Sequence, residues 1–196
     1  MGGGGGKMII GITGTNGAGK DLVSQILLKK LGWPYFSLSD ELRRIALENN
    51  LDVSRPTLQQ LGNELRQQHG PSYLSQRIVD RAADDFIVTS LRNPQECEPF
   101  KQKSRFILIA VDAPIELRYE RISGRDRAGE SNWSLADFKR NEDEFEMDGG
   151  EFGRQLRKMM QTADITIINN GTVVDLENKL NQIIAEVKNV STLYLG

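Results

Sequence analysis

The sequence of 196 residues contains one cysteine, one histidine and no long apolar run. The single cysteine, Cys97, excludes an internal disulfide framework and a cysteine-cluster zinc site, and the single histidine, His69, excludes multi-histidine metal chemistry. The longest apolar runs have about six residues, far fewer than the ~20 that a membrane helix needs. We therefore expect no membrane partner and, by default, a cytoplasmic protein in a reducing environment.

The sequence also lacks an excess of charge of either sign. The 25 Lys and Arg residues nearly balance the 27 Asp and Glu residues, and the formal net charge is −2. This balance argues against non-specific binding to nucleic acid through bulk charge, so we expect no nucleic-acid partner. Residues 1–7, MGGGGGK, resemble an added leader that no packed core would use. The remaining length and ordinary globular composition suit a single α/β domain over residues 8–190.

Short apolar runs alternate with segments of helical period, which is the pattern of βαβ units on a parallel sheet. The strands are nearly all apolar, as expected where helices cover both faces of a sheet. Strands are expected at residues 8–13, 35–38, 86–90, 106–111 and 165–168. Helices are expected at residues 20–31, 39–49, 57–68, 72–84, 95–103, 114–123, 135–145, 153–162 and 173–188. Leu58, Leu61 and Leu65 predict one buried stripe on the third of these helices.

The strongest functional signal is a glycine-rich segment directly after the first strand and directly before the first helix. It reads Gly14, Thr15, Asn16, Gly17, Ala18, Gly19, Lys20, which is the G-x-x-x-x-G-K pattern in the context that this motif requires. Glycines let backbone N–H groups turn toward phosphate oxygens, the helix N-terminus adds its dipole, and the lysine adds a point charge. We therefore predict that all seven residues bind ATP, the alternative being a structural turn.

The residue after this loop departs from the motif. Asp21 stands where Ser or Thr commonly contacts Mg²⁺, while Thr89 and Ser90 end the strand where such proteins often place a metal-linked Asp. We hypothesise that carboxylate and hydroxyl have exchanged places across the metal site, so that Asp21 binds both ATP and Mg²⁺. The alternative is that Asp21 is only a first-turn residue favoured by the helix dipole.

Several further segments carry a family resemblance. FSLSDELR at residues 36–43 resembles the segment with which nucleoside monophosphate kinases grip the acceptor phosphate, and Arg92 matches the second acceptor-side arginine of that family. ERISGR at residues 120–125 and KRNED at residues 139–143 resemble the start of their lid and the helix that closes it. ADITIINNGT at residues 163–172 looks like the last strand and base-binding loop of dephospho-CoA kinases. The GKD sequence at residues 19–21 is similar to phage-type deoxynucleoside monophosphate kinases.

The chain thus resembles the P-loop nucleoside monophosphate kinase superfamily, with likenesses to deoxynucleoside monophosphate, adenylate and dephospho-CoA kinases. The resemblance implies a three-layer α/β fold with a five-stranded parallel sheet in the order 2-3-1-4-5, the strand at 8–13 being central. It implies an acceptor-binding region at about 36–84 and a short lid at about 125–145. The implied ligands are ATP as phosphoryl donor, Mg²⁺, and a small-molecule nucleotide acceptor.

The resemblance also assigns residues to roles. Phosphoryl transfer leaves little covalent work for the protein, so positioning and charge neutralisation by Lys, Arg and Mg²⁺ carry catalysis. Catalysis is assigned to Lys20, Arg125 and Arg140. ATP binding is assigned to Arg121, Asn170 and Gly171 in addition to the loop and Asp21. Acceptor binding is assigned to Asp40, Arg43 and Arg92; Asp40 is either a general base or a residue at a helix N-terminus.

Three arginines of one expected helix form a cationic stripe, because Arg118, Arg121 and Arg125 follow an i, i+3, i+7 spacing. Such a stripe suits a polyphosphate ligand. The alternative is a solvated face neutralised by Glu116 and Glu120, and this is the interpretation that we favour for Arg118. The tract at 125–134 is expected to be a mobile surface loop that closes over the nucleotides, in which Trp133 either covers the nucleotide or anchors the loop.

These features favour a kinase that transfers the γ-phosphoryl group of ATP to a nucleoside monophosphate, with a deoxynucleotide as one option. A dephospho-CoA kinase is the alternative enzyme. From another class, the chain could be an ATP-binding or ATPase regulatory module without small-molecule kinase activity. The acceptor base, the sugar and the oligomeric state are left open by the sequence.

Overall fold

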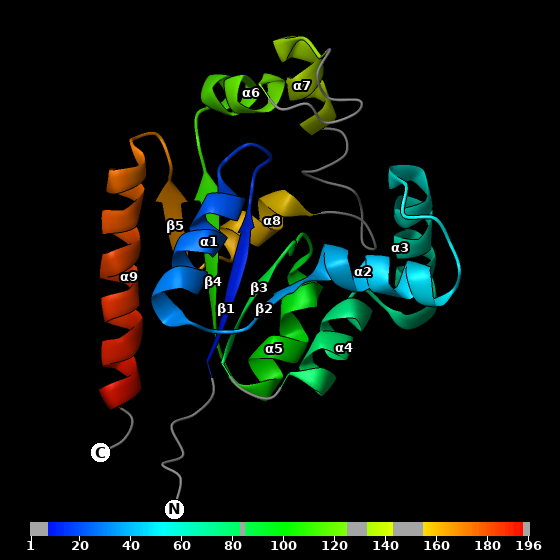
Figure 1. The fold of residues 1–196 in the computed structure, drawn as a ribbon, viewed down its shortest axis with the longest axis horizontal. Coiled ribbons are helices and arrows are strands. Elements are labelled where there is room, and N and C mark those ends of the chain that lie inside the picture. The colour runs from blue at the N-terminus through cyan, green and yellow to red at the C-terminus, as the bar shows by residue number, and fades with distance from the viewer. Residues whose placement is uncertain (1–7, 83–84, 125–132, 143–154, 194–196) are drawn as a thin grey trace, which may run out of the picture.

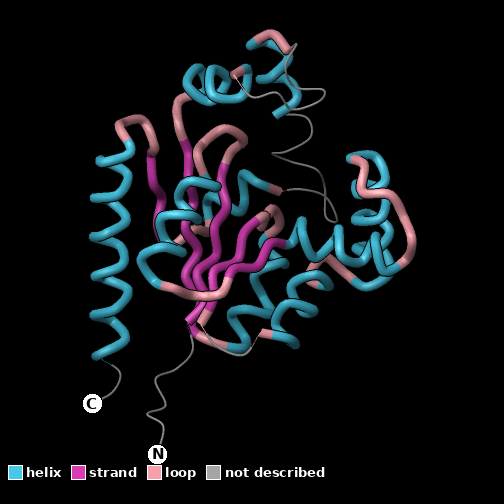
Figure 2. Tube along the Cα trace, viewed as in Figure 1, coloured by secondary structure: helices cyan, strands magenta, loops and turns pink. Residues whose placement is uncertain are grey.

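The computed structural model describes residues 8–82, 85–124, 133–142 and 155–193. A single parallel sheet has the strand order β2-β3-β1-β4-β5, which confirms the predicted order with β1 in the centre (Figures 1 and 2). Its strands are β1 (Met8–Gly14), β2 (Tyr35–Ser37), β3 (Phe86–Thr89), β4 (Arg105–Asp112) and β5 (Ile165–Ile168). Each end of an expected strand therefore lies within one residue of the observed end.

Helices cover both faces of the sheet, as the apolar strands predict. On one face, α1 (Lys20–Leu31) and α9 (Val173–Leu193) pack over Ile10 and Ile12 of β1. On the other, α4 (Tyr73–Arg81), α5 (Glu98–Lys103) and α8 (Leu156–Gln161) pack over Ile9. Successive β1 residues thus enter opposite cores, because side chains alternate along a strand. The edge strand β5 is less covered, and Ile168 is 44% exposed.

The remaining helices lie around the carboxyl ends of the strands and at one side of the sheet (Figure 1). They are α2 (Leu38–Glu48), α3 (Arg55–His69), the 3-10 turn η1 (Pro94–Cys97), α6 (Ile115–Ser123) and α7 (Leu135–Asn141). In α3, Leu61 is buried while Leu58 and Leu65 pack partly buried against the same core, which confirms the predicted stripe.

Several expected helices differ in length from the observed ones: α9 runs five residues past the expected end at 188, and α8 is shorter at both ends than the expected 153–162. Two further differences have a local cause. The helix expected at 95–103 is divided into η1 and α5, with a proline in the first turn of each. Proline lacks an N–H and is tolerated in a first turn but not in a helix interior, so Pro99 begins a new helix. The helix expected at 72–84 ends at Arg81, because Ala82 has extended backbone.

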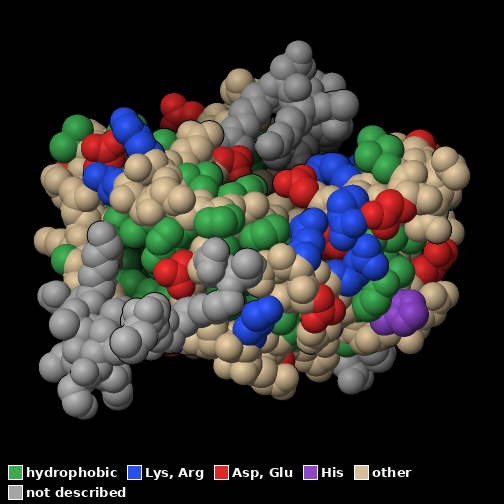
Figure 3. Space-filling view, turned by 60° about the horizontal axis from the view of Figure 1, so that its bottom comes forward, with side chains coloured by type: hydrophobic (Ala, Val, Ile, Leu, Met, Phe, Trp, Pro, Cys, Tyr) green, Lys and Arg blue, Asp and Glu red, His purple; other side chains and the backbone are tan. Residues whose placement is uncertain are grey.

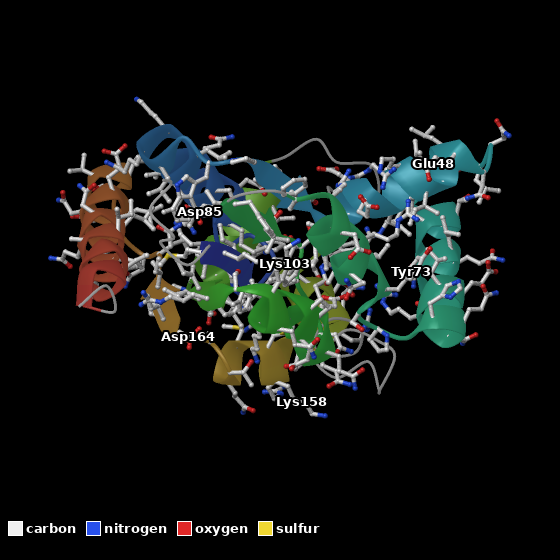
Figure 4. All side chains as sticks on the ribbon, turned by 90° about the horizontal axis from the view of Figure 1, so that it is seen from below. Glu48, Tyr73, Asp85, Lys103, Lys158 and Asp164 are labelled. Atoms are coloured by element: carbon white, nitrogen blue, oxygen red, sulfur yellow. The ribbon has the colours of Figure 1, made fainter. Side chains whose placement is uncertain are left out.

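Charged side chains at the amino ends of the strands serve the backbone. The Asp85 carboxylate accepts a hydrogen bond from the Met8 N–H at 2.6 Å, and that of Asp164 accepts one from the Leu108 N–H at 2.7 Å. The Lys103 ammonium donates to the Ala82 carbonyl at 3.3 Å, just past the end of α4 (Figure 4). These charges close the ends of secondary structure at the edge opposite the phosphate-binding loop. No described helix is both long enough and apolar enough to span a membrane.

Candidate nucleotide-binding site

The glycine-rich loop joins β1 to α1 at the centre of the sheet, in the strand–loop–helix context that the sequence predicts. Gly14 has φ 138° and Gly19 has φ 98°, both in the region that favours glycine. A Cβ on Gly14 would lie 1.9 Å from the Val111 carbonyl oxygen, and one on Gly19 would lie 2.5 Å from Asn169 Nδ2. The motif glycines are therefore required by close approach as well as by backbone conformation.

The amino end of α1 lies at the mouth of this loop. Gly19 is the N-cap residue and provides no side-chain cap, so the first-turn N–H groups point toward the space where an anion would bind. The Lys20 ammonium donates to the Thr15 carbonyl at 2.7 Å across the loop. The Thr15 hydroxyl donates to the Asp112 carboxylate at 2.6 Å, which ties the loop to the end of β4. The loop is thereby held in a closed curve.

Side chains from two other elements hold the outward carbonyls of the loop. The Asn169 amide donates to the Ala18 carbonyl at 2.8 Å, and Arg121 donates to the Gly17 carbonyl at 3.4 Å. Arg121 also donates to the Asn169 carbonyl at 3.0 Å, so the two donors support each other. Arg121 thus lies beside the loop, and its contact with ATP stays a prediction. Asn169 is an addition to the predicted set, which contains its exposed neighbours Asn170 and Gly171.

The position of Arg118 corrects a prediction. The sequence favours a solvated face for Arg118, but the residue is only 6% exposed. Its guanidinium forms an ion pair with the buried carboxylate of Glu142, just past α7, and lies over the Phe138 ring at 5.8 Å. The interpretation is wrong because helical spacing identifies a stripe without identifying what packs against it. Glu142 lies 24 residues further along the chain.

The predicted acceptor residues gather at the carboxyl ends of β2 and β3. Ser37 caps α2 and accepts from the Asp40 N–H at 3.3 Å, which places Asp40 in the first helical turn. Asp40 and Arg43 are both exposed and form an ion pair of 2.7 Å. Arg92 lies in the turn after β3, two residues beyond Ser90, whose φ of 66° is unusual for a residue other than glycine.

A buried glutamate that the sequence did not suggest fixes the turn after β3. The Glu96 carboxylate accepts hydrogen bonds from the Arg92 N–H at 2.7 Å and from the Asn93 N–H at 3.1 Å. Burial raises the pKa of Glu96, and these N–H groups and the charges of Arg66 and Arg92 only partly offset that effect. The backbone that presents Arg92 is thus held by a buried carboxyl group. Burial likewise raises the pKa of the neighbouring Cys97 thiol to about 12, so this cysteine is poorly suited to act as a nucleophile.

The three residues of the Mg²⁺ hypothesis, Asp21, Thr89 and Ser90, differ in exposure and in their contacts. Asp21 is exposed in the first turn of α1. The Thr89 hydroxyl lies 2.8 Å from that of Tyr35, and the Ser90 hydroxyl lies 3.2 Å from that of Ser37. Within the described ranges no group of three or more His, Cys, Asp or Glu side chains could hold a metal ion. One carboxylate beside a phosphate site fits Mg²⁺, which takes one or two carboxylates together with phosphate oxygens and water.

The predicted lid is only partly described. Arg125 and most of the tract at 125–134 lie outside the described residues. Arg140 is exposed on α7 and pairs with Asp137 of its own helix at 2.7 Å. Trp133 is described and is half-buried, and its carbonyl accepts a hydrogen bond from the Tyr119 hydroxyl at 2.7 Å. The catalytic assignment of Arg125 and Arg140 stays a prediction.

A second ionic cluster lies between α2 and α4, beside the acceptor residues. The side chain of Glu41 is fully buried and bonds to Arg44 at 2.5 Å, Arg77 at 2.9 Å and Arg81 at 2.7 Å. Burial alone would raise the pKa of Glu41, but the bonds from Arg44 and Arg77 and the charge of Arg81 outweigh it, and its pKa lies below the usual value. On this side of the molecule, basic side chains gather with acidic ones among them (Figure 3).

Sheet order, central loop and flanking helices together define the P-loop kinase fold. Solved structures with this fold include shikimate kinase from Acinetobacter baumannii in complex with shikimate, with a TM-score of 0.52, 19% identity and coverage of 93% of this chain and 94% of that one. Shikimate kinase from Bacteroides thetaiotaomicron has a TM-score of 0.59 and 9% identity, and the match covers 91% of this chain and 98% of that one. At these identities the likeness shows the fold alone.

Within this fold the chain belongs to the AAA_18 family of AAA domains, which it matches over residues 10–145. Its relatives include a UPF0200 protein from Aeropyrum pernix, 26% identical over 87% of this chain and 89% of the relative. A UPF0200/UPF0201 protein from Archaeoglobus fulgidus is 28% identical over 93% of this chain. The match spans 57% of the length of that Archaeoglobus relative.

Proposed function

We propose that this protein is an ATP-dependent kinase that transfers the γ-phosphoryl group to a nucleoside monophosphate. The observation that carries the proposal is the arrangement at the carboxyl edge of the sheet. A phosphate-binding loop ends β1, and two arginines, Arg43 and Arg92, follow the neighbouring strands β2 and β3. Donor and acceptor phosphates held at adjacent strand ends would meet over β1, as in other open α/β sheets that bind ligands at this edge.

On the donor side, the loop N–H groups and Lys20 would hold the β- and γ-phosphates of ATP. Arg121 would contact the nucleotide from beside the loop, and Asn170 and Gly171 from the turn after β5. Asp21 would hold Mg²⁺, which supplies neutralisation of phosphate charge when bound. Because Arg118, Arg121 and Asn169 already hold the carbonyls of Asn16, Gly17 and Ala18, these carbonyls would need no rearrangement when phosphates bind.

On the acceptor side, Arg43 and Arg92 would hold the acceptor phosphate by charge-assisted hydrogen bonds. A phosphate acceptor is already ionised, so Asp40 need not act as a base for it. An acceptor hydroxyl, as in a dephospho-CoA kinase, would instead be helped by the Asp40 carboxylate. Arg125 and Arg140 would neutralise charge in the transition state. We propose the region at about 36–84 as acceptor-binding and the region at about 125–145 as the lid of one domain over residues 8–190.

Turnover of ATP with a panel of acceptors tests this proposal. The panel contains ribonucleoside and deoxyribonucleoside monophosphates, dephospho-CoA, and a reaction without acceptor. Lys20→Ala should abolish transfer while the melting temperature stays near that of the wild type, because the Lys20 ammonium serves the ligand rather than the core. Lys29→Ala, at an exposed lysine of the same helix, is the matched control and should retain activity.

The outcomes separate the candidate functions. Transfer to a nucleoside monophosphate supports the proposal, and transfer to dephospho-CoA alone replaces it with the alternative kinase. ATP hydrolysis that no acceptor stimulates would instead favour an ATPase module. Transfer by Lys20→Ala at the wild-type rate would remove Lys20 from the mechanism.

A further inference from the structure

Helix α6 lies directly against the phosphate-binding loop. A Cβ on Gly17 would be 2.6 Å from the Arg118 carbonyl oxygen and 3.0 Å from Cδ1 of Ile122. A loop that turns its N–H groups toward a ligand turns carbonyl groups the other way, and here those carbonyls face protein. Carbonyl groups enclosed in this way need hydrogen-bond donors. Arg118 reaches the Asn16 carbonyl at 3.5 Å, beside the donors that Arg121 and Asn169 provide to the next two residues.

The guanidinium of Arg118 joins several elements at one point. Its Nε donates to the Ala113 carbonyl at 2.8 Å, and one of its terminal nitrogens bonds to both Glu142 and Asn16. The Asp112 carboxylate lies 3.7 Å from Nε. Asp112 also accepts from the Thr15 hydroxyl, so Arg118 and Asp112 contact the loop at two residues, Asn16 and Thr15. The end of β4, the start of α6, the end of α7 and the loop therefore share one buried cation.

Stability alone does not explain this buried pair. Replacing a buried ion pair with apolar side chains of similar volume is often neutral or stabilising, whereas removing one partner leaves a costly unpaired charge. What the apolar replacement would lack is a donor aimed at the Asn16 carbonyl. We propose that Arg118 is a positioning residue of the phosphate-binding loop, oriented by Glu142, which holds the Asn16 carbonyl outward so that the loop N–H groups face the ligand. The link to catalysis rests on the proposed kinase function.

Paired substitutions separate positioning from stability. Arg118→Met and Glu142→Leu should each lower the melting temperature, and the double variant should recover much of that loss because no buried charge is left unpaired. In the double variant, amide hydrogen exchange at residues 14–20 without nucleotide should still be faster than in the wild type, while exchange at residues 22–31 is unchanged. Affinity for MgATP should fall by about tenfold or more, the value of a hydrogen bond to a charged group.

The control and a conservative variant sharpen the test. Glu116 and Lys139 form another, exposed ion pair between α6 and α7, with 3.7 Å between their charged atoms. Glu116→Gln breaks this pair and should change neither hydrogen exchange in the loop nor the affinity for MgATP. Arg118→Lys keeps the charge but not the fork of donors, and should recover only part of the affinity.

Each outcome decides a different question. Loop exchange equal to the wild type in the double variant, or a loss of protection spread evenly over residues 14–31, would show a purely structural role for Arg118 and overturn the inference. Wild-type protein that binds no MgATP, while loop exchange still rises locally in the double variant, would instead overturn the proposed function and leave the loop-positioning role standing.

Discussion

The buried carboxylate of Glu41 offers a sharp test of how α2 is held against α4. Its side chain is fully buried, and three guanidinium groups that are 31–40% exposed surround it. In Glu41→Gln the shape is kept and the charge is lost, so three cations face a neutral amide. The neighbouring Glu48 also bonds to Arg44 and Arg77, at 2.5 and 3.4 Å, but is 48% exposed. Glu48→Gln is therefore the matched control. In Figure 4 the labels Glu48 and Tyr73 mark the two helices, α2 and α4, that this cluster joins.

The expected magnitude follows from burial. Breaking a fully buried pair typically costs about 3–5 kcal/mol, but these arginines can turn partly into water, so we expect about 2–3 kcal/mol for Glu41→Gln. For a chain of this size that corresponds to a fall of roughly 4–12 °C in melting temperature. The two exposed pairs of Glu48 are worth less, ~0.3–0.5 kcal/mol for the i,i+4 pair with Arg44 and ~0–1 kcal/mol for the pair with Arg77. Glu48→Gln should therefore lower the melting temperature by no more than about 6 °C.

The pH dependence of stability distinguishes the loss of the Glu41 charge from a change in packing. Because the pKa of Glu41 is lower in the folded protein, its charge contributes stability above the unfolded pKa of ~4.3, and this stability is lost as pH falls through the folded pKa. Glutamine does not titrate, so the difference between wild type and Glu41→Gln should shrink in acid. Thermal melts at several pH values measure it. Equal melting temperatures at pH 7, or a difference that persists unchanged in acid, would refute the ionic account.

Two further predictions concern the ligands. Arg43→Ala or Arg92→Ala should weaken acceptor binding by roughly 10–100-fold, since each charge-assisted bond is worth ~1.5–3 kcal/mol, and should change ATP binding little. Calorimetric titration with each substrate measures both affinities. Equal losses of the two affinities would show that these arginines do not belong to the acceptor site. Asp21→Ser restores the common loop residue while deleting the charge, and should raise the Mg²⁺ concentration needed for half-maximal activity. Wild-type activity of Asp21→Ser at limiting Mg²⁺ would leave Asp21 as a first-turn residue only.

Local pattern was sufficient to predict the frame of this molecule. The helix expected at 20–31 and the strand expected at 165–168 have the observed bounds, because glycines or loop residues flank each segment and the apolar period within it is clear. The strand order is implied by the family resemblance, and the place of the phosphate-binding loop near the switch point of an open sheet agrees with it. The largest end error is at α9, which runs to Leu193 rather than 188, and Pro99 explains why the helix expected at 95–103 is divided.

Contacts between distant segments could not be predicted in the same way. Asn169 bonds to Ala18 across 151 residues, and Glu41 bonds to Arg77 across 36. Hydrophobic period shows which face of an element is buried, but not which element covers it. A polar residue in a favourable local position therefore gives no sign of a remote partner. Arg118 is an example: the sequence offers Glu116 and Glu120 as its local partners, but its buried partner is Glu142.

Arg121 illustrates how structural and functional roles can coexist in one side chain. The sequence predicts that Arg121 binds ATP, and in the structure its terminal nitrogens donate to the Gly17 and Asn169 carbonyls. These bonds use the edge of the guanidinium, in the plane of its N–H groups. The faces of that plane take no part in them, and a guanidinium face is a surface on which aromatic rings stack. The same arginine can therefore hold the loop through its edge and present a face to a nucleotide base, so the contacts to the loop are compatible with the predicted contact to ATP.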